Sequence, residues 1–200
     1  MKKTIGYFDI HLHGADPVKG ITAESIIADA NNPNIVTRLF GDIVDCKNAV
    51  KKLVEAAQKL KRKLQSLLGD KYKTGNHEVD QDEDIPTLVN GWLCCHSDMI
   101  YNGLIESKKD RMVTPGAGKF SRFLKGSASK ARDAGLINLH GKMDDPEVQA
   151  RFLEYCARYG GTKGVIGGHK HPSEKLTAEI NGLKFVIYPR GRHEVTELAE

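Results

Sequence analysis

The chain has few cysteines, and their spacing matches neither a disulfide framework nor a thiolate zinc site. The four cysteines are Cys46, Cys94, Cys95 and Cys156. None belongs to a C-x-x-C pair, and the adjacent Cys94 and Cys95 cannot adopt the geometry of an ordinary disulfide. We therefore expect reduced, buried thiols, as is usual in a cytoplasmic protein.

Long apolar runs are also lacking. No stretch approaches the roughly 18 residues of a membrane span, and the apolar segment before Asp9 is too brief for a cleavable signal peptide. The sequence thus predicts no transmembrane segment and a cytoplasmic location. A strong excess of one charge is absent as well, because the net charge of +4 only slightly favours anionic partners. With 40% apolar residues and neither a repeat nor a linker, we expect one domain over residues 1–200.

The first half of the chain alternates strand and helix patterns. Thr22 is a typical N-cap for the first helix, and Gly69 supplies a typical end for the second. Apolar residues recur at helical spacing between these points, which indicates helices that cover one face of a sheet. The expected elements are strands at 4–8, 35–40 and 71–73 and helices at 22–30 and 50–68.

The second half favours antiparallel pairs. Asn90-Gly91 and Asn181-Gly182 each stand between two apolar runs, and this dipeptide is a strong signal for a two-residue hairpin. The change from strand–helix–strand units to hairpins predicts an α/β fold with a mixed two-sheet core and helices outside. The expected elements are strands at 88–89, 92–95, 165–167, 176–180 and 183–188 and a helix capped by Asp144 or Asp145 that ends before Gly160.

A basic segment lies between the two halves. Residues 107–132 carry eight basic side chains against one acid, Asp110, and are interrupted by glycine and serine. We interpret this segment as an insertion that resembles a lid or arm, with an ordinary solvated loop as the alternative. Gly116 to Lys119 is not a phosphate-binding loop, because the first glycine of that motif is missing and Phe120 replaces the hydroxyl residue.

Side chains that can bind a metal ion follow the predicted strands. Each alone would be an ordinary turn residue or histidine, but together they supply imidazole, carboxylate and amide donors without a cysteine. Such a set favours manganese, iron or zinc. Two ions fit better than one, because a shared carboxylate can hold ions about 3.5–4 Å apart. The clusters are Asp9-x-His11, Gly41-Asp42-x-x-Asp45, Gly75-Asn76-His77-Glu78, His96 and Gly168-His169-x-His171.

These five blocks resemble the pattern of the calcineurin-like metallophosphoesterases, which is D-x-H, G-D-x-x-D, G-N-H-D/E, H and G-H-x-H. The blocks occur in the same order, from Asp9 to His171. The resemblance implies a four-layer α/β/β/α sandwich of two mixed β-sheets flanked by helices. It also implies a phosphoester hydrolase with two divalent metal ions, with manganese as the first choice and iron, zinc, nickel or magnesium as alternatives.

The resemblance also implies a role for each residue of the blocks. His77 would stabilise the transition state or protonate the leaving oxygen, and Asp45 would hydrogen-bond His77 and favour its charged form. The metal ligands form two sets with one shared carboxylate. The ligands implied for one ion are Asp9, His11 and His171, those for the other are Asn76, His96 and His169, and the bridging ligand is Asp42.

Five further residues lie outside the blocks. We interpret His13 as a pocket-lining residue and His140 and His193 as bystanders. Arg190 and Arg192 follow the last apolar strand, where either could approach a substrate phosphate, but a surface position is the simpler interpretation.

The substrate is less well defined by the sequence. Protein serine/threonine phosphatases of this superfamily carry phosphate-clamping arginines after G-D-x-x-D and before G-N-H-E, where this chain has Cys46 and Thr74. We therefore expect a phosphodiesterase or nucleotide phosphohydrolase. The basic residues 107–132 would attract its substrate, a nucleotide or a nucleic acid. The alternatives are a phosphomonoesterase, a sugar-nucleotide pyrophosphatase, and a metal-binding scaffold without catalysis. The oligomeric state stays open.

Overall fold

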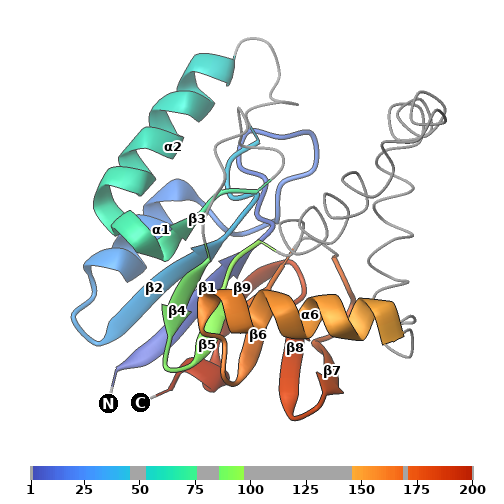
Figure 1. Cartoon of the computed structure of the whole chain (residues 1–200). Coiled ribbons are helices and arrows are strands. Elements are labelled where there is room, and N and C mark those ends of the chain that lie inside the picture. The colour runs from blue at the N-terminus through green and yellow to red at the C-terminus, as the bar shows by residue number, and fades with distance from the viewer. Residues whose placement is uncertain (1, 46–52, 76–85, 97–145, 169–170, 200) are drawn as a thin grey trace, which may run out of the picture.

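The described residues form two mixed β-sheets and three α-helices (Figure 1). The computed structural model describes residues 2–45, 53–75, 86–96, 146–168 and 171–199. The predicted α/β class and the two mixed sheets are confirmed for these residues. Four predicted features lie outside the described residues. They are the basic segment 107–132, the predicted metal ligands Asn76 and His169, the predicted acid His77, and the beginning of the second predicted helix.

The first sheet has the strand order β3-β2-β1-β9. β1, β2 and β3 run parallel, as their helical connections require, and β9 is antiparallel to β1. The strands predicted in the first half are confirmed, whereas β9 was not predicted. The bounds are Lys3–Phe8 for β1, Ile35–Phe40 for β2, Tyr72–Lys73 for β3 and Gly191–Glu194 for β9.

Two helices pack against this sheet, α1 (Ala23–Asn31) and α2 (Val54–Leu68). α1 begins with a capping box, in which the backbone N–H of Ser25 donates to the Thr22 hydroxyl and the N–H of Thr22 donates to the Ser25 hydroxyl. α2 ends at Gly69, whose φ of 55° suits glycine. Among the described helices, none is both long and apolar enough to cross a membrane.

The second sheet has the strand order β4-β5-β6-β8-β7. β5, β6 and β8 are parallel, and the edge strands β4 and β7 belong to the two predicted Asn-Gly hairpins. α6 (Pro146–Tyr159) packs on this sheet (Figure 1). The bounds are Thr87–Val89 for β4, Trp92–Cys94 for β5, Gly164–Gly167 for β6, Leu176–Ile180 for β7 and Leu183–Ile187 for β8.

Successive side chains along a strand point to opposite faces of the sheet and so enter different buried clusters. In β2, Leu39 packs with α1 and α2, while Phe40 joins a cluster that contains residues of both sheets. In β6, Val165 packs with α6, and Ile166 joins the cluster shared by the sheets. All four side chains are at most 1% exposed. Each sheet therefore has two apolar faces, one toward helices and one in the shared cluster.

An aromatic stack in the shared cluster fixes the end of β1. The Phe8 ring is stacked on Phe40, with 4.3 Å between ring centroids, and on Tyr188 at 4.8 Å. Such pairs contribute about 0.5–1.5 kcal/mol beyond the burial of their apolar area. Because Asp9 directly follows Phe8, this packing determines where the first polar loop leaves the sheet.

Candidate metal centre

The loops that follow β1 and β2 continue the pairing of their strands. The N–H of Asp9 donates to the carbonyl of Gly41 at 3.2 Å, and the N–H of His11 donates to the carbonyl of Asp42 at 2.8 Å. Ile10 is fully buried in the core beneath α1 and α2. Asp9, His11 and Asp42 are thus held on two adjacent, hydrogen-bonded segments.

Candidate ligands have an unusual backbone conformation. Non-glycine residues rarely adopt a positive φ, which costs about 1–3 kcal/mol and is concentrated at functional sites. Among the described residues, the two hairpin asparagines are the only such residues far from the candidate centre. The positive values at the centre are 50° for Asp9, 56° for His11, 67° for His13, 49° for Asp42 and 26° for His171.

The side chains form two groups of three metal donors. One group consists of Asp9, His11 and His171, and the other of Asp9, Asp42 and His96; within each group the donor atoms lie within 4.8 Å of one another. The first group is the set implied for one ion by the sequence. Asp9 is common to both groups. The sequence resemblance instead implied Asp42 as the ligand shared by the two ions.

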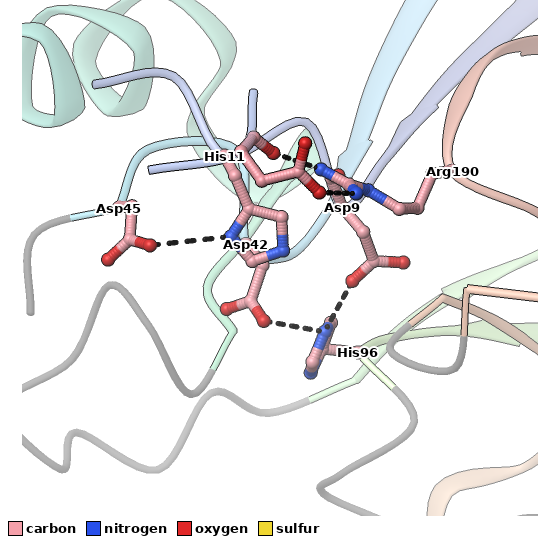
Figure 2. Close-up of polar contacts among 7 residues, drawn as sticks. Asp9, His11, Asp42, Asp45, His96 and Arg190 are labelled. Atoms are coloured by element: carbon pink, nitrogen blue, oxygen red, sulfur yellow. Dashed lines mark hydrogen bonds and ion pairs between the residues drawn. The ribbon is translucent and has the colours of Figure 1, made fainter. Parts of the chain in front are cut away.

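The second group is wholly buried and rich in negative charge. His96 Nε2 lies 3.1 Å from Asp9 Oδ1 and 3.5 Å from Asp42 Oδ2, and Figure 2 shows both contacts ending on the same ring nitrogen. None of the three residues is more than 2% exposed. Two buried carboxylates need positive charge nearby, and a divalent ion would supply it. The imidazole and carboxylate donors of both groups fit an ion such as manganese, iron or zinc.

Two glycines allow this close packing. A Cβ atom at Gly41 would overlap the His96 ring, and a Cβ atom at Gly75 would overlap the Asp42 carboxylate and backbone nitrogen. Gly41 also has a φ of 88°, which glycine adopts at little cost. The glycines of the G-D-x-x-D and G-N-H-E blocks therefore make room for side chains of other blocks.

Asp45 lies beside a candidate ligand. Its Oδ2 is 3.6 Å from His11 Nδ1, and both residues are buried (Figure 2). A carboxylate at this nitrogen can orient the imidazole so that the other ring nitrogen faces a metal. The partner that the sequence implied for Asp45, His77, lies outside the described residues, so that role stays a prediction.

Arg190 is closer to the centre than the sequence indicated. Its Nε donates to the backbone carbonyl of Asp9 at 3.0 Å, and its Nη1 donates to Asp16 Oδ2 at 2.8 Å. The hydrogen bond and the charge of Arg190 hold the pKa of Asp16 below its usual value. No short sequence pattern signals these contacts, because they join residues at opposite ends of the chain.

The other residues singled out in the sequence have simpler surroundings. Arg192 Nε donates to Asp29 at 2.7 Å, away from the metal donors. His193 packs near the rings of Phe8 and Tyr188, and its interpretation as a bystander stays a prediction. His13 is half-buried, and His140 lies outside the described residues.

The structure thus brings together five of the seven predicted metal ligands. Asn76 and His169, with the predicted acid His77, lie outside the described residues, and their roles stay predictions. No protein-family model matches the chain, and a comparison with curated proteins also gave no match.

Proposed function

We propose that this protein is a phosphoester hydrolase with a binuclear metal centre. The observation that carries the proposal is the convergence of Asp9, His11, Asp42, His96 and His171 in two donor groups that share a carboxylate. These residues come from four separate sequence blocks, in the order typical of the calcineurin-like metallophosphoesterases. Asp9, His11, Asp42 and His96 are buried and His171 is exposed. An accidental cluster of surface acids would not include four buried residues, nor would it combine imidazole with carboxylate donors.

The proposed architecture is the four-layer α/β/β/α sandwich of that superfamily. In this arrangement α1 and α2 form one outer layer, the two sheets form the inner layers, and α6 belongs to the other outer layer. The three buried clusters support this order, since one joins α1 and α2 to the first sheet, one joins α6 to the second, and the third contains residues of both sheets.

The chain supplies residues that would bind the two metal ions and a residue that would act on the leaving oxygen of the substrate. Asp9, His11 and His171 would hold one ion, and Asp9, Asp42 and His96 the other, with Asn76 and His169 as further ligands predicted from sequence. Bound divalent ions supply Lewis acidity, which acidifies water and neutralises charge on a phosphoryl group. Asp45 orients His11. His77, predicted from sequence, would stabilise the transition state or donate a proton to the departing oxygen.

We propose a phosphodiester or a nucleotide as the substrate class. The absence of arginine at Cys46 and Thr74 supports this choice over a phosphoprotein, and the basic segment 107–132 would attract such anions. A phosphomonoester or a sugar nucleotide is the alternative substrate. The alternative of another class, a silent metal-binding scaffold, predicts metal binding without turnover.

The first test is hydrolysis of bis-(p-nitrophenyl) phosphate and p-nitrophenyl phosphate by metal-stripped protein reloaded with manganese, together with elemental analysis. We expect about two ions per chain and faster cleavage of the diester. Faster cleavage of the monoester would favour the alternative substrates. Bound metal without cleavage of either compound or of a nucleotide panel would contradict the proposed activity.

Two substitutions distinguish which carboxylate is shared between the ions. Because Asp9 belongs to both donor groups, Asp9→Asn should remove both ions, whereas Asp42→Asn should remove mainly the ion held with His96. Elemental analysis after equilibrium dialysis against manganese measures the loss. If Asp42→Asn removes both ions and Asp9→Asn only one, Asp42 is the bridge, as the resemblance to the superfamily implies.

A further inference from the structure

Arg190 contacts the ligand loop at three points. Its Nε donates to the Asp9 carbonyl at 3.0 Å, Nη1 donates to the Asp16 carboxylate at 2.8 Å, and Nη2 donates to the Asp16 carbonyl. The guanidinium is planar and presents its donors in a fixed arrangement, so it can hold several acceptors at once. All of these acceptors belong to the segment that contains Asp9 and His11.

The position of Arg190 is itself fixed by the core. Tyr188 stacks on Phe8, and its backbone N–H donates to the carbonyl of Gly167 at 3.0 Å. Phe8 directly precedes Asp9, and Tyr188 lies two residues before Arg190. The same stack therefore holds close together the two backbone segments that carry the guanidinium and the carbonyl that it binds.

The segment from Asp9 to Asp16 needs such support. Asp9, His11 and His13 all have positive φ angles, which short loops do not maintain unless neighbouring structure restrains them. Local hydrogen bonds help, since the N–H of Gly14 donates to the His11 carbonyl and that of Val18 donates to the Ile10 carbonyl. Arg190 is the contact that binds the carbonyl of Asp9 itself, the residue common to both donor groups.

We infer that Arg190 is a positioning residue for the metal centre, which together with Asp16 holds the Asp9–Asp16 loop in the shape that directs Asp9 and His11 toward the ions. This inference rests on the metal centre proposed above but not on its hydrolytic activity. The exposure of the two side chains fits the role: the Arg190 side chain is 21% exposed, whereas the Asp16 side chain is 87% exposed and faces solvent. We call the ion pair of Arg190 and Asp16 the clamp, in which Arg190 is the inner, more buried member and Asp16 the outer one.

The test compares manganese affinity among variants of the whole chain. Arg190→Gln should weaken manganese binding by about 10- to 100-fold, the effect typical of residues that orient metal ligands. Arg190→Lys should recover part of the affinity, because an ammonium group can still donate to the backbone carbonyls. Arg192→Gln is the matched control, since Arg192 binds Asp29 instead of the ligand loop, and its manganese affinity should equal that of the unaltered protein.

Affinity is measured by calorimetric titration of metal-stripped protein, and thermal unfolding in a chelator checks that each variant is folded. Cobalt absorption spectra supply a second readout, and Arg190→Gln should alter the bands that report ligand geometry. Equal manganese affinity and cobalt spectra in Arg190→Gln and the unaltered protein would overturn the inference, as would an equal loss in Arg192→Gln.

The inference and the proposed function can fail separately. If Arg190→Gln binds manganese normally but has a raised KM for phosphoesters, Arg190 contacts the substrate and is not a positioning residue, while the hydrolase proposal stands. If the protein binds manganese, Arg190→Gln weakens that binding, and no phosphoester is cleaved, the positioning role holds and the proposed activity is wrong.

Discussion

At the scale of single residues, Asp29 connects α1 to the first sheet. Its Oδ2 accepts hydrogen bonds from the Tyr7 hydroxyl and from Arg192 Nε, both at 2.7 Å. Burial raises the pKa of Asp29, but the hydrogen bonds from Arg192 and Tyr7 outweigh burial and lower the pKa below its usual value. Because the pKa is lower in the folded state, the charged carboxylate stabilises the fold above the unfolded pKa. This contribution is lost as the pH falls through the folded pKa.

We predict that Asp29→Asn lowers the free energy of unfolding by about 1.5–3 kcal/mol near pH 7, the usual size for hydrogen bonds to a charged group. The difference from the unaltered protein should shrink below about pH 3.9, where the unfolded carboxyl group is protonated. Urea unfolding of both metal-stripped proteins at several pH values measures this difference in the free energy of unfolding. Asp70→Asn is the control, because the Asp70 side chain is exposed. A difference that does not depend on pH would contradict this role of the charge.

At the scale of elements, the two hairpins offer a matched comparison. Gly91 and Gly182 occupy the same turn position with φ angles of 84° and 81°. A Cβ atom at Gly91 would lie 2.6 Å from the Thr162 hydroxyl oxygen, whereas one at Gly182 would meet nothing within 4 Å. The turn that joins β4 to β5 is therefore packed against the segment before β6, and the turn that joins β7 to β8 is open.

We predict that Gly182→Ala destabilises the protein by about 1–2 kcal/mol through backbone strain alone. Gly91→Ala should cost about 1–3 kcal/mol more, because the added methyl group also overlaps Thr162. Urea unfolding measures both. In a Thr162→Ala background, where the hydroxyl is removed, the excess cost of Gly91→Ala should largely disappear. Equal costs at the two glycines would show that packing against Thr162 has no effect.

Local sequence signals predicted most elements because their causes are local. The cap at Thr22 and the two Asn-Gly turns act over a few residues, and each produced the expected helix or hairpin. β9 could not be found in this way. Residues 191–194 lack an apolar pattern, and they form a strand because β1 offers an unpaired edge. Its strand character depends on a partner from the other end of the chain.

The same reasoning separates the predicted from the unpredicted parts of the candidate centre. Asp9, His11 and Asp42 stand directly after strands whose parallel pairing places their ends together, so spacing alone was informative. Arg190 was interpreted as a surface residue, because nothing in its neighbours indicates that it binds the carbonyl of Asp9. The proximity of Asp45 to His11 depends on the loop geometry after β2, which spacing does not determine.

At the scale of the whole molecule, the candidate centre lies where the two sheets meet. Asp9, His11 and Asp42 follow strands of the first sheet, whereas His96 follows β5 and His171 follows β6 of the second. A bound ion would therefore hold the sheets together. Ligands that bind only the folded state stabilise it by about 2.7 kcal/mol at 100 times the Kd.

We predict that manganese raises the melting temperature of metal-stripped protein and that a chelator reverses the increase. Thermal unfolding followed by circular dichroism measures the change. Asp9→Asn, which removes the carboxylate shared by both groups, should respond little to manganese. A melting temperature that does not change, although elemental analysis finds bound ions, would mean that the unfolded chain binds the ions as tightly as the folded one, which contradicts a site assembled by the fold.

The pairing of β1 with β9 has a consequence for synthesis on the ribosome. β1 is made before β9, and one of its edges is completed only by residues 191–194. The nascent chain can thus form β1, α1 and β2 early, while Arg190 and β9 have yet to emerge. The loop that carries Asp9 would lack its clamp during that time. Tight metal binding should accordingly begin only after β9 has left the exit tunnel, later than the synthesis of the ligands themselves.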